Sequence, residues 1–255
     1  MIVARSLSKA YGKETVVRDV SIAIPRGGIT SIIGPNGAGK STLLALISRL
    51  LPATSGSAFV DDLDVALAPS DVLARRLSIL RQDNHIAARL SVRDLVAFGR
   101  FPHSRGRLTA HDQLRIDEAI RYLGLEDLSD RFIDEMSGGQ RQRAFVAMVL
   151  CQDTDYVLLD EPLNNLDMRH ATGMMKLIRR IADELGKTFV LVLHDINFAS
   201  IYSDNIIAMR DGSVIRQGPP ADILQSAVLH DIFDFDIPIH EFDEHRLGLF
   251  YLAEV

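Results

Sequence analysis

Short apolar runs and longer amphipathic stretches alternate along this sequence. The apolar runs have the length and the β-branched composition of strands: GITSIIG at 28–34, YVLLD at 156–160, TFVLVLH at 188–194 and NIIAM at 205–209. Segments such as STLLALISRLL at 41–51 and HATGMMKLIRRIADELG at 170–186 have apolar residues at helical spacing. This alternation predicts an α/β fold with a mostly parallel central sheet. Because the strand runs are apolar at both alternating positions, we expect helices on both faces of the sheet.

The strand signal stops after Gln82, where helical patterns such as HDQLRIDEAIRYLGLEDL at 111–128 take over. We therefore expect an α/β core at about 1–82 and 155–215, interrupted by an inserted helical subdomain at about 83–154. Alternating apolar residues near the end predict a C-terminal extension at about 216–255 that adds antiparallel strands. The whole chain, 1–255, is then one domain with an insert.

Composition indicates a globular protein without disulfides. Hydrophobic residues make up 47% of 255, which is ample for a core. The single cysteine, Cys151, ends the apolar run AFVAMVLC, so we expect a buried thiol and a reducing compartment.

Charge and hydropathy exclude several classes of partner. A net charge of −6 argues against a broad nucleic-acid-binding surface, which would need a basic stripe. No apolar run approaches the roughly 18 residues of a membrane span, and the charged N-terminus does not resemble a signal peptide. One local basic stretch, Arg100 to His111, is expected to be a loop that is either solvated or a docking surface.

The clearest chemical motif is GPNGAGKST, which matches the phosphate-binding pattern GxxxxGK[ST] between a predicted strand and a predicted helix. The glycines let successive backbone N–H groups point at a polyphosphate. The lysine can reach the β- and γ-phosphates, and the following serine can ligate Mg²⁺. The candidate ATP-binding residues of this loop are Gly34, Pro35, Asn36, Gly37, Ala38, Gly39, Lys40, Ser41 and Thr42.

A carboxylate pair follows the strand YVLLD, at the sheet edge where open α/β sheets bind ligands. We expect Asp160 to hold the Mg²⁺ and Glu161 to polarise an attacking water as a general base. His194 ends another strand at the same edge and is a candidate γ-phosphate sensor. Gln82 ends LSILRQ and is a candidate sensor of metal or water.

A second anion site is predicted at MSGGQRQR, where Ser137, Gly138 and Gly139 come directly before an amphipathic helix. The phosphate-binding loop already surrounds one polyphosphate. The simplest resolution is therefore a second copy of the chain.

Together these motifs resemble the nucleotide-binding subunit of ABC transporters over essentially the whole chain. The resemblance implies that Tyr11 stacks on adenine, and that Ser137, Gly138, Gly139 and Gln140 belong to the signature that meets the opposite subunit's nucleotide. It places the D-loop at 164–167, with Asp167 near nucleotide, and the switch histidine at His194. Two departures are Met136 in place of the usual leucine and Asn164-Asn165 in place of Ser-Ala.

The segments EPLNNLD, LHDINFASIYSD and GRFPHSRGRLT more specifically resemble ATPases of iron-chelate (siderophore) importers. This resemblance implies an ABC-type P-loop NTPase that binds ATP and Mg²⁺ in an ATP-dependent head-to-tail homodimer. Two transmembrane permease subunits would hold it at the cytoplasmic face of the membrane through the helical insert. A substrate-binding protein would be an indirect partner, and no nucleic acid is expected.

Three alternatives remain at this point. The same ATPase could serve haem, cobalamin or another cargo. A soluble ABC protein acting on ribosomes or nucleic acid usually has two ATPase halves or a long coiled-coil insertion, whereas this chain has one phosphate-binding loop and a short insert. A P-loop kinase is disfavoured by the second anion site and by Glu161.

Overall fold

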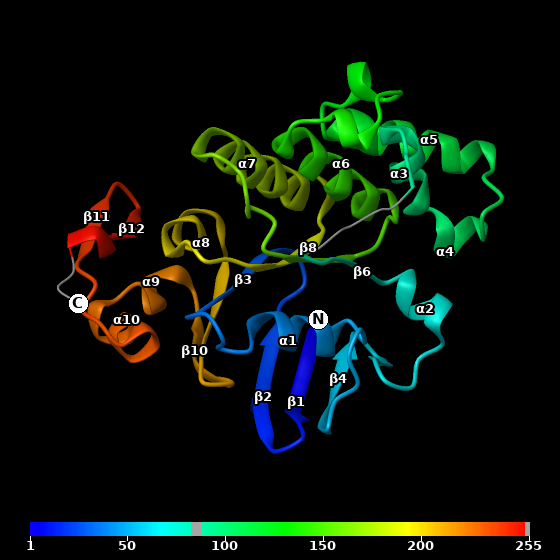
Figure 1. The fold of residues 1–255 in the computed structure, drawn as a ribbon. Coiled ribbons are helices and arrows are strands. Elements are labelled where there is room, and N and C mark those ends of the chain that lie inside the picture. The colour runs from blue at the N-terminus through cyan, green and yellow to red at the C-terminus, as the bar shows by residue number, and fades with distance from the viewer. Residues whose placement is uncertain (83–87, 253–255) are drawn as a thin grey trace.

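The computed structural model describes residues 1–82 and 88–252. Its central sheet has six strands in the order β10-β9-β3-β8-β7-β6, and all neighbours are parallel except β9 and β10 (Figure 1). The strands are β3 (Gly28–Ile33), β6 (Leu77–Leu80), β7 (Tyr156–Asp160), β8 (Thr188–Val192), β9 (Asn205–Arg210) and β10 (Ser213–Gly218). The predicted mostly parallel sheet is confirmed.

The fold also contains the predicted antiparallel β portion, but its main sheet lies in the N-terminal part of the chain, where no position was predicted for it. Its order is β2-β1-β4-β5, and its strands are β1 (Ile2–Tyr11), β2 (Glu14–Ile24), β4 (Ser55–Val60) and β5 (Leu63–Asp64). A turn at Gly12 and Lys13 joins the first two strands, with Gly12 at a φ of 61°. The glycine in this short turn, followed by the β-branched run TVVRDVSIAI, is the signal that could have predicted the hairpin.

The expectation that helices cover both faces of the parallel sheet is only half right. Val157 and Leu159 of β7 pack into the core cluster that contains α7 (Met168–Leu185) and the helical insert. Tyr156 and Leu158 point to the other cluster. That second cluster combines α1 (Lys40–Ile47) with the antiparallel sheet, because one helix is too small to cover the face.

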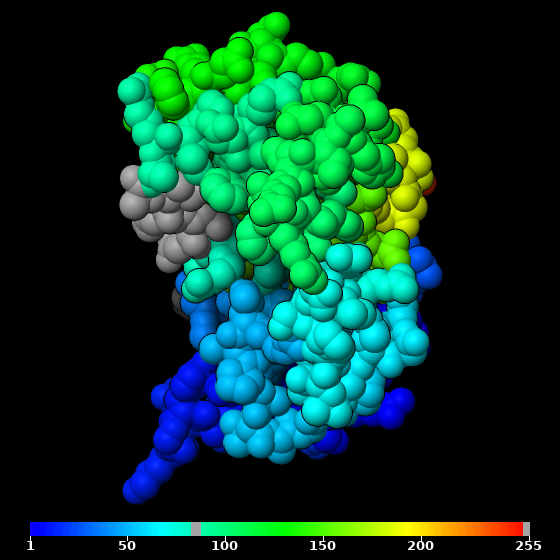
Figure 2. Space-filling view, turned by 90° about the vertical axis from the view of Figure 1, so that its right-hand side faces the viewer, coloured from blue at the N-terminus to red at the C-terminus, as the bar shows by residue number. Residues whose placement is uncertain are grey.

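Between β6 and β7 the described residues form helices and no strand, as predicted, apart from one isolated bridge between Ser91 and Phe132. The helices are α3 (Val92–Phe98), α4 (Phe101–Ser104), α5 (Ala110–Tyr122), η1 (Glu126–Leu128), η2 (Ile133–Glu135) and α6 (Gly138–Cys151), while α2 (Ser70–Ala74) precedes β6. Capping boxes start α3, α5 and α6. In Figure 2 the green residues of this insert lie above the blue and cyan residues of the N-terminal part of the chain. The first residues expected in the insert, 83–87, lie outside the described residues.

The basic stretch at 100–111 is not a simple loop. It contains α4 and the start of α5, and Arg100 is buried at 2% exposure. Arg100 Nε donates to Asp112 Oδ1 at 2.9 Å, and Arg100 Nη1 donates to the carbonyl of Cys151 at 2.9 Å. This is a correction, because one of the expected surface cations is a buried link between α4, α5 and α6. Cys151 itself is buried, as expected.

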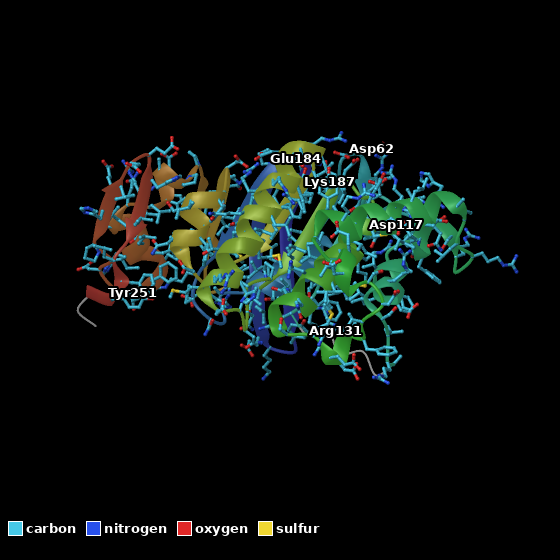
Figure 3. The ribbon with its side chains drawn as sticks, turned by 90° about the horizontal axis from the view of Figure 1, so that it is seen from above. Asp62, Asp117, Arg131, Glu184, Lys187 and Tyr251 are labelled. Atoms are coloured by element: carbon cyan, nitrogen blue, oxygen red, sulfur yellow. The ribbon has the colours of Figure 1, made fainter. Side chains whose placement is uncertain are left out.

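The C-terminal region adds helices and a hairpin at one end of the molecule. Its elements are α8 (Ile196–Tyr202), α9 (Pro220–Ile223), α10 (Ser226–Phe233), β11 (Ile239–Phe242), β12 (His245–Gly248) and η3 (Phe250–Leu252). β11 and β12 pair antiparallel, which confirms the predicted strands of the tail. Figure 3 places Tyr251 at the end opposite to Asp117 of the helical insert. The last residues expected in the extension, 253–255, lie outside the described residues.

None of the helices within 1–82 and 88–252 combines the length and apolar character needed to cross a membrane.

Candidate functional site

The phosphate-binding loop lies between the end of β3 and the start of α1. Gly34, Gly37 and Gly39 have φ values of 145°, 80° and 91°, which disfavour residues with a Cβ. A Cβ on Gly34 would lie 2.0 Å from the carbonyl oxygen of Met209, and one on Gly39 would lie 2.6 Å from that of Val16. These two glycines are therefore required by packing against β9 and β2, before any ligand is considered.

Lys40 is folded back onto this loop. Its Nζ donates to the carbonyls of Gly34 at 2.9 Å and Pro35 at 2.8 Å, and the residue is 5% exposed. Burial lowers the pKa of Lys40, and the carboxylates of Glu161 and Asp160 oppose this shift. An ammonium held at the mouth of a loop of backbone N–H groups is suited to bind phosphate oxygens.

The other residues of the phosphate-binding loop form a tight turn and the first turn of the following helix. The backbone N–H of Ala38 donates to the carbonyl of Pro35 at 3.2 Å, which closes a turn. Asn36 is exposed at the tip of this turn, and Thr42 is half-buried in the first turn of α1.

The three residues predicted to contact metal line one cleft of about 230 Å³: Ser41, Gln82 and Asp160. Ser41 Oγ donates to Asp160 Oδ1 at 2.8 Å, which brings the start of α1 to the end of β7. Burial raises the pKa of Asp160, while the hydrogen bond from Ser41 opposes the shift. A hydroxyl, a carboxylate and a side-chain amide are oxygen donors of the type that Mg²⁺ prefers.

Glu161 is held by side chains from two other strand ends. Gln82 Nε2 donates to its Oε2 at 2.6 Å, and His194 Nε2 lies 2.7 Å from its Oε1. Glu161 has a φ of 51°, and its side chain is only 11% exposed. A carboxylate with both oxygens engaged at the mouth of a phosphate site is placed to accept a proton from water.

Sequence reasoning missed one neighbour of this carboxylate. Asn164 Nδ2 also donates to Glu161 Oε2, at 3.5 Å. Asn164 was noted as a departure from the usual D-loop composition. Its position three residues after Glu161, in a turn closed by a hydrogen bond between their backbones, is the signal that could have indicated the contact.

The predicted second anion site lies at the start of a helix, α6, but this helix begins earlier in the sequence than expected. Ser137 is the N-cap of α6, and its Oγ accepts from the backbone N–H of Gln140 at 3.4 Å, while Gln140 Oε1 accepts from Ser137 N at 3.1 Å. Gly138 and Gly139 form the first turn of α6 instead of preceding it. The structure places this turn in the helical insert and the phosphate-binding loop in the core, so one chain does not bring the two together.

Two further residues predicted to contact nucleotide, Tyr11 and Asp167, lie next to turns of the chain. Tyr11 ends β1 with its ring half-exposed and the Lys9 ammonium 5.0 Å from the ring centroid. The next strand, β2, contacts the phosphate-binding loop through the carbonyl of Val16 near Gly39, so the hairpin lies beside the loop. Asp167 is the exposed N-cap of α7.

Residues 17–164 match the family described as ABC transporter. The chain is 51% identical over 251 residues to a petrobactin import ATP-binding protein of Bacillus subtilis (strain 168), covering 98% of this chain and 100% of the relative. It is 52% identical over 239 residues to a petrobactin import ATP-binding protein of Bacillus anthracis, covering 94% and 96%. Its fold resembles the dimeric post-hydrolysis structure of the ATP-binding cassette MJ0796 with ADP and Pi, at a TM-score of 0.76 and 28% identity over 86% and 99% of the two chains.

Proposed function

The chain belongs to the ABC transporter family, and from this premise we propose that it is the ATP-hydrolysing subunit of a ferric siderophore importer. The observation that carries the hydrolytic part is the fixed carboxylate of Glu161 beside the Ser41–Asp160 pair. ATP hydrolysis needs both a phosphate cradle and a base that activates water.

In this proposal, the loop at 34–42 and Lys40 bind the β- and γ-phosphates. Glu161 takes a proton from a water whose oxygen attacks the γ-phosphorus. The bond to the bridging oxygen breaks, and ADP and phosphate leave. Gln82 and His194 hold the carboxylate in the orientation that this proton transfer needs, since they engage its two oxygens separately.

We assign Mg²⁺ binding to Ser41, Asp160 and Gln82. The proposal is supported by the shared cleft and by the 2.8 Å approach of Ser41 Oγ to Asp160 Oδ1, because these atoms converge on one point. When bound, Mg²⁺ would neutralise charge on the phosphates. Gln82 uses its Nε2 for Glu161, and its amide oxygen is of the type that could accept from a water or bind a metal.

The remaining nucleotide contacts are assigned to one residue beside the phosphate-binding loop of the same chain and to a group that would act across a dimer. Tyr11 would stack on adenine beside the phosphate-binding loop of its own chain. Ser137, Gly138, Gly139 and Gln140, together with Asp167, would meet the nucleotide held by a second copy in a head-to-tail dimer. Support comes from the position of Gly138 and Gly139 in the first turn of α6 and from the dimeric state of the similar cassette.

The partners follow from the importer assignment. Two permease subunits would hold the chain at the cytoplasmic face of the membrane, with the helical insert at 83–154 as the docking body. The core at 1–82 and 155–215 would bind nucleotide, and the extension at 216–255 would pack on the core. A substrate-binding protein would deliver the cargo from the other side.

The cargo assignment rests on the relatives. Two relatives above 50% identity are named for petrobactin import, and one at 37% identity is named for iron(3+)-hydroxamate import. We therefore propose a ferric siderophore as cargo and petrobactin as the first compound to test.

The test is reconstitution of the chain with its co-purified permease in liposomes. We expect ATP-dependent uptake of ferric petrobactin or another ferric siderophore, and none with the Glu161→Gln chain. Uptake of haem or cobalamin, with every ferric siderophore inactive, would overturn the cargo assignment while leaving the ATPase assignment intact. Phosphorylated organic product in place of free phosphate would overturn hydrolysis itself.

A further inference from the structure

The D-loop and the first turn of α6 pack directly against each other within one chain. A Cβ built on Gly138 would lie 3.7 Å from the carbonyl oxygen of Asn165. A Cβ on Gly139 would lie 2.6 Å from Cδ2 and 2.9 Å from Cγ of His170. The imidazole thus occupies the space in front of Gly139, and a side chain at this position would require the ring to move.

One carboxylate fixes this imidazole. Asp167 Oδ1 accepts from the backbone N–H of His170 at 2.8 Å and lies 2.8 Å from its Nδ1. Because an ionised carboxylate only accepts, Nδ1 carries the proton in this contact, and Nε2 lies on the side of Gly139. The same carboxylate therefore caps α7 and sets the orientation of the ring that touches α6.

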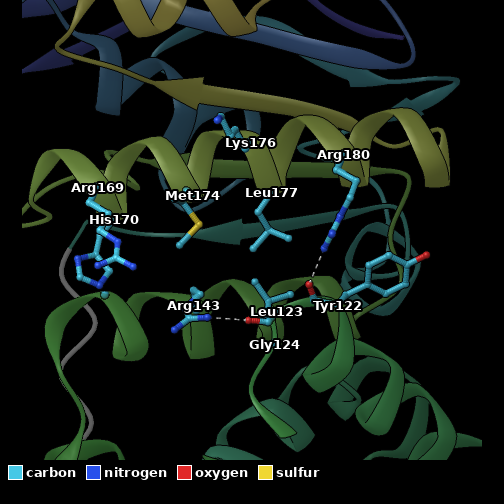
Figure 4. Close-up of a pocket in the computed structure, with 12 residues that line it drawn as sticks. Tyr122, Leu123, Gly124, Arg143, Arg169, His170, Met174, Lys176, Leu177 and Arg180 are labelled. Atoms are coloured by element: carbon cyan, nitrogen blue, oxygen red, sulfur yellow. Dashed lines mark hydrogen bonds between the residues drawn. The ribbon is translucent and has the colours of Figure 1, made fainter.

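The contact between His170 and Gly139 lies at one end of an open cleft. The cleft has a volume of about 710 Å³ and runs between α6 and α7 from His170 to Arg180 (Figure 4). Along it, Leu177 of α7 is partly buried and lines the cleft, whereas Met174 is 2% exposed and packs in the core cluster that also contains residues of α6. At the His170 end the two helices are in contact through the imidazole.

We propose that His170 is a positioning residue that joins the D-loop and the signature turn of one chain into a single rigid unit for the second chain's nucleotide. This inference rests on the proposed function, since both segments act across the dimer there. His170 touches neither the phosphate-binding loop nor Glu161, so its loss should leave ATP binding to the monomer unchanged. It should instead weaken the closed dimer.

The experiment measures two quantities in the Glu161→Gln background: ATP affinity of the monomer and the Mg-ATP-dependent dimer dissociation constant by light scattering. We expect His170→Ala to keep the ATP affinity of the monomer within about twofold of that of the parent protein and to weaken dimerisation about tenfold. His170→Asn retains a donor for Asp167 and should restore most of the loss. Lys176→Ala, exposed on the same helix, is the matched control and should change neither quantity.

A double-mutant cycle separates steric contact from nucleotide contact. Gly139→Ala places a methyl group against the imidazole, and removal of the ring in Gly139→Ala/His170→Ala gives it room. We expect the double variant to dimerise better than the sum of the two losses predicts. If the losses of dimer affinity in the two single variants simply add, or if the His170→Ala dimer is as tight as its parent, the role of His170 is overturned while the proposed function stands. A Glu161→Gln protein that stays monomeric with Mg-ATP would overturn the composite site, and the role of His170 with it.

Discussion

His194 Nε2 lies 2.7 Å from Glu161 Oε1, although 33 positions separate the two residues in the sequence. Parallel strands β7 and β8 are neighbours in the sheet, so the residues that follow them emerge at the same edge. Gln82 reaches the same carboxylate from the end of β6, the next strand on the other side. Residues that follow three adjacent strands thus orient the carboxylate of Glu161.

Glu161→Gln should retain ATP binding and lower turnover by about 10²–10⁴, because an amide cannot take a proton from water. Phosphate release and the affinity for a fluorescent ATP analogue measure the two effects separately. Glu184→Gln, an exposed change on α7, is the matched control. Hydrolysis at the wild-type rate by Glu161→Gln would show that another group is the base.

Lys40→Ala should weaken ATP binding by about 10- to 100-fold, since it removes a charged donor to the phosphates. The unliganded protein should keep its fold, although the carbonyls of Gly34 and Pro35 lose their shared donor. Isothermal titration with ATP measures the affinity, and Lys13→Ala on the exposed β1–β2 turn serves as control. Equal affinity for Lys40→Ala and the wild type would contradict the assignment of the loop.

Arg100→Ala should cost about 3–5 kcal/mol of the free energy of unfolding, because it leaves the buried Asp112 carboxylate without its cation. Arg107→Ala, an exposed change seven residues away, should stay within about 0.5 kcal/mol. Urea unfolding monitored by circular dichroism measures both. Similar losses for the two variants would mean that the ion pair does not stabilise the insert.

The same pair predicts a pH dependence of stability. A hydrogen bond from the backbone of Thr109, together with Arg100, lowers the pKa of Asp112 from 3.8 to about 2. The unfolded chain therefore binds the proton first as pH falls, so this stabilisation is complete above about pH 4 and is lost between pH 4 and pH 2. Asp112→Asn should flatten the fall in unfolding free energy over this window. An unchanged slope would rule out Asp112 as its source.

The C-terminal hairpin is held on α8 by a reciprocal amide contact. Asn197 Oδ1 accepts from the backbone N–H of Gly248 at 2.8 Å, and its Nδ2 donates to the carbonyl of Gly248 at 3.2 Å. Asn197→Ala should destabilise the hairpin by about 1–3 kcal/mol and speed amide exchange at 239–248. His240→Ala, exposed on β11, is the control. Unchanged exchange in Asn197→Ala would show that the hairpin is held by other contacts.

Cys151 should be inert in the folded protein. Burial raises the pKa of its thiol to about 12, so almost no thiolate is present near neutral pH. A chromogenic thiol reagent should react with one equivalent only after unfolding in guanidinium. Rapid native reaction at pH 8 would contradict both the burial and the pKa.

Much of the site was predictable from local sequence, because its residues follow strands. The strand runs place Asp160 and His194 at strand ends, and parallel strands deliver their ends to one edge. The glycines of the phosphate-binding loop precede a helix whose apolar period is plain in the sequence. Strands and helices are recognisable in short segments, and their alternation along the chain indicates a parallel sheet, so these features could be predicted without the tertiary structure.

The tertiary structure decided which distant groups meet. The sequence pattern assigned Arg100 to a polar loop, yet α5 places Asp112 where the buried guanidinium needs a partner. The pattern gave no sign that His170 would lie against Gly139, because that contact depends on how α7 crosses the start of α6. Periodicity reports which residues face inward or outward, whereas the partner across an interface depends on the packing of segments far apart in the chain.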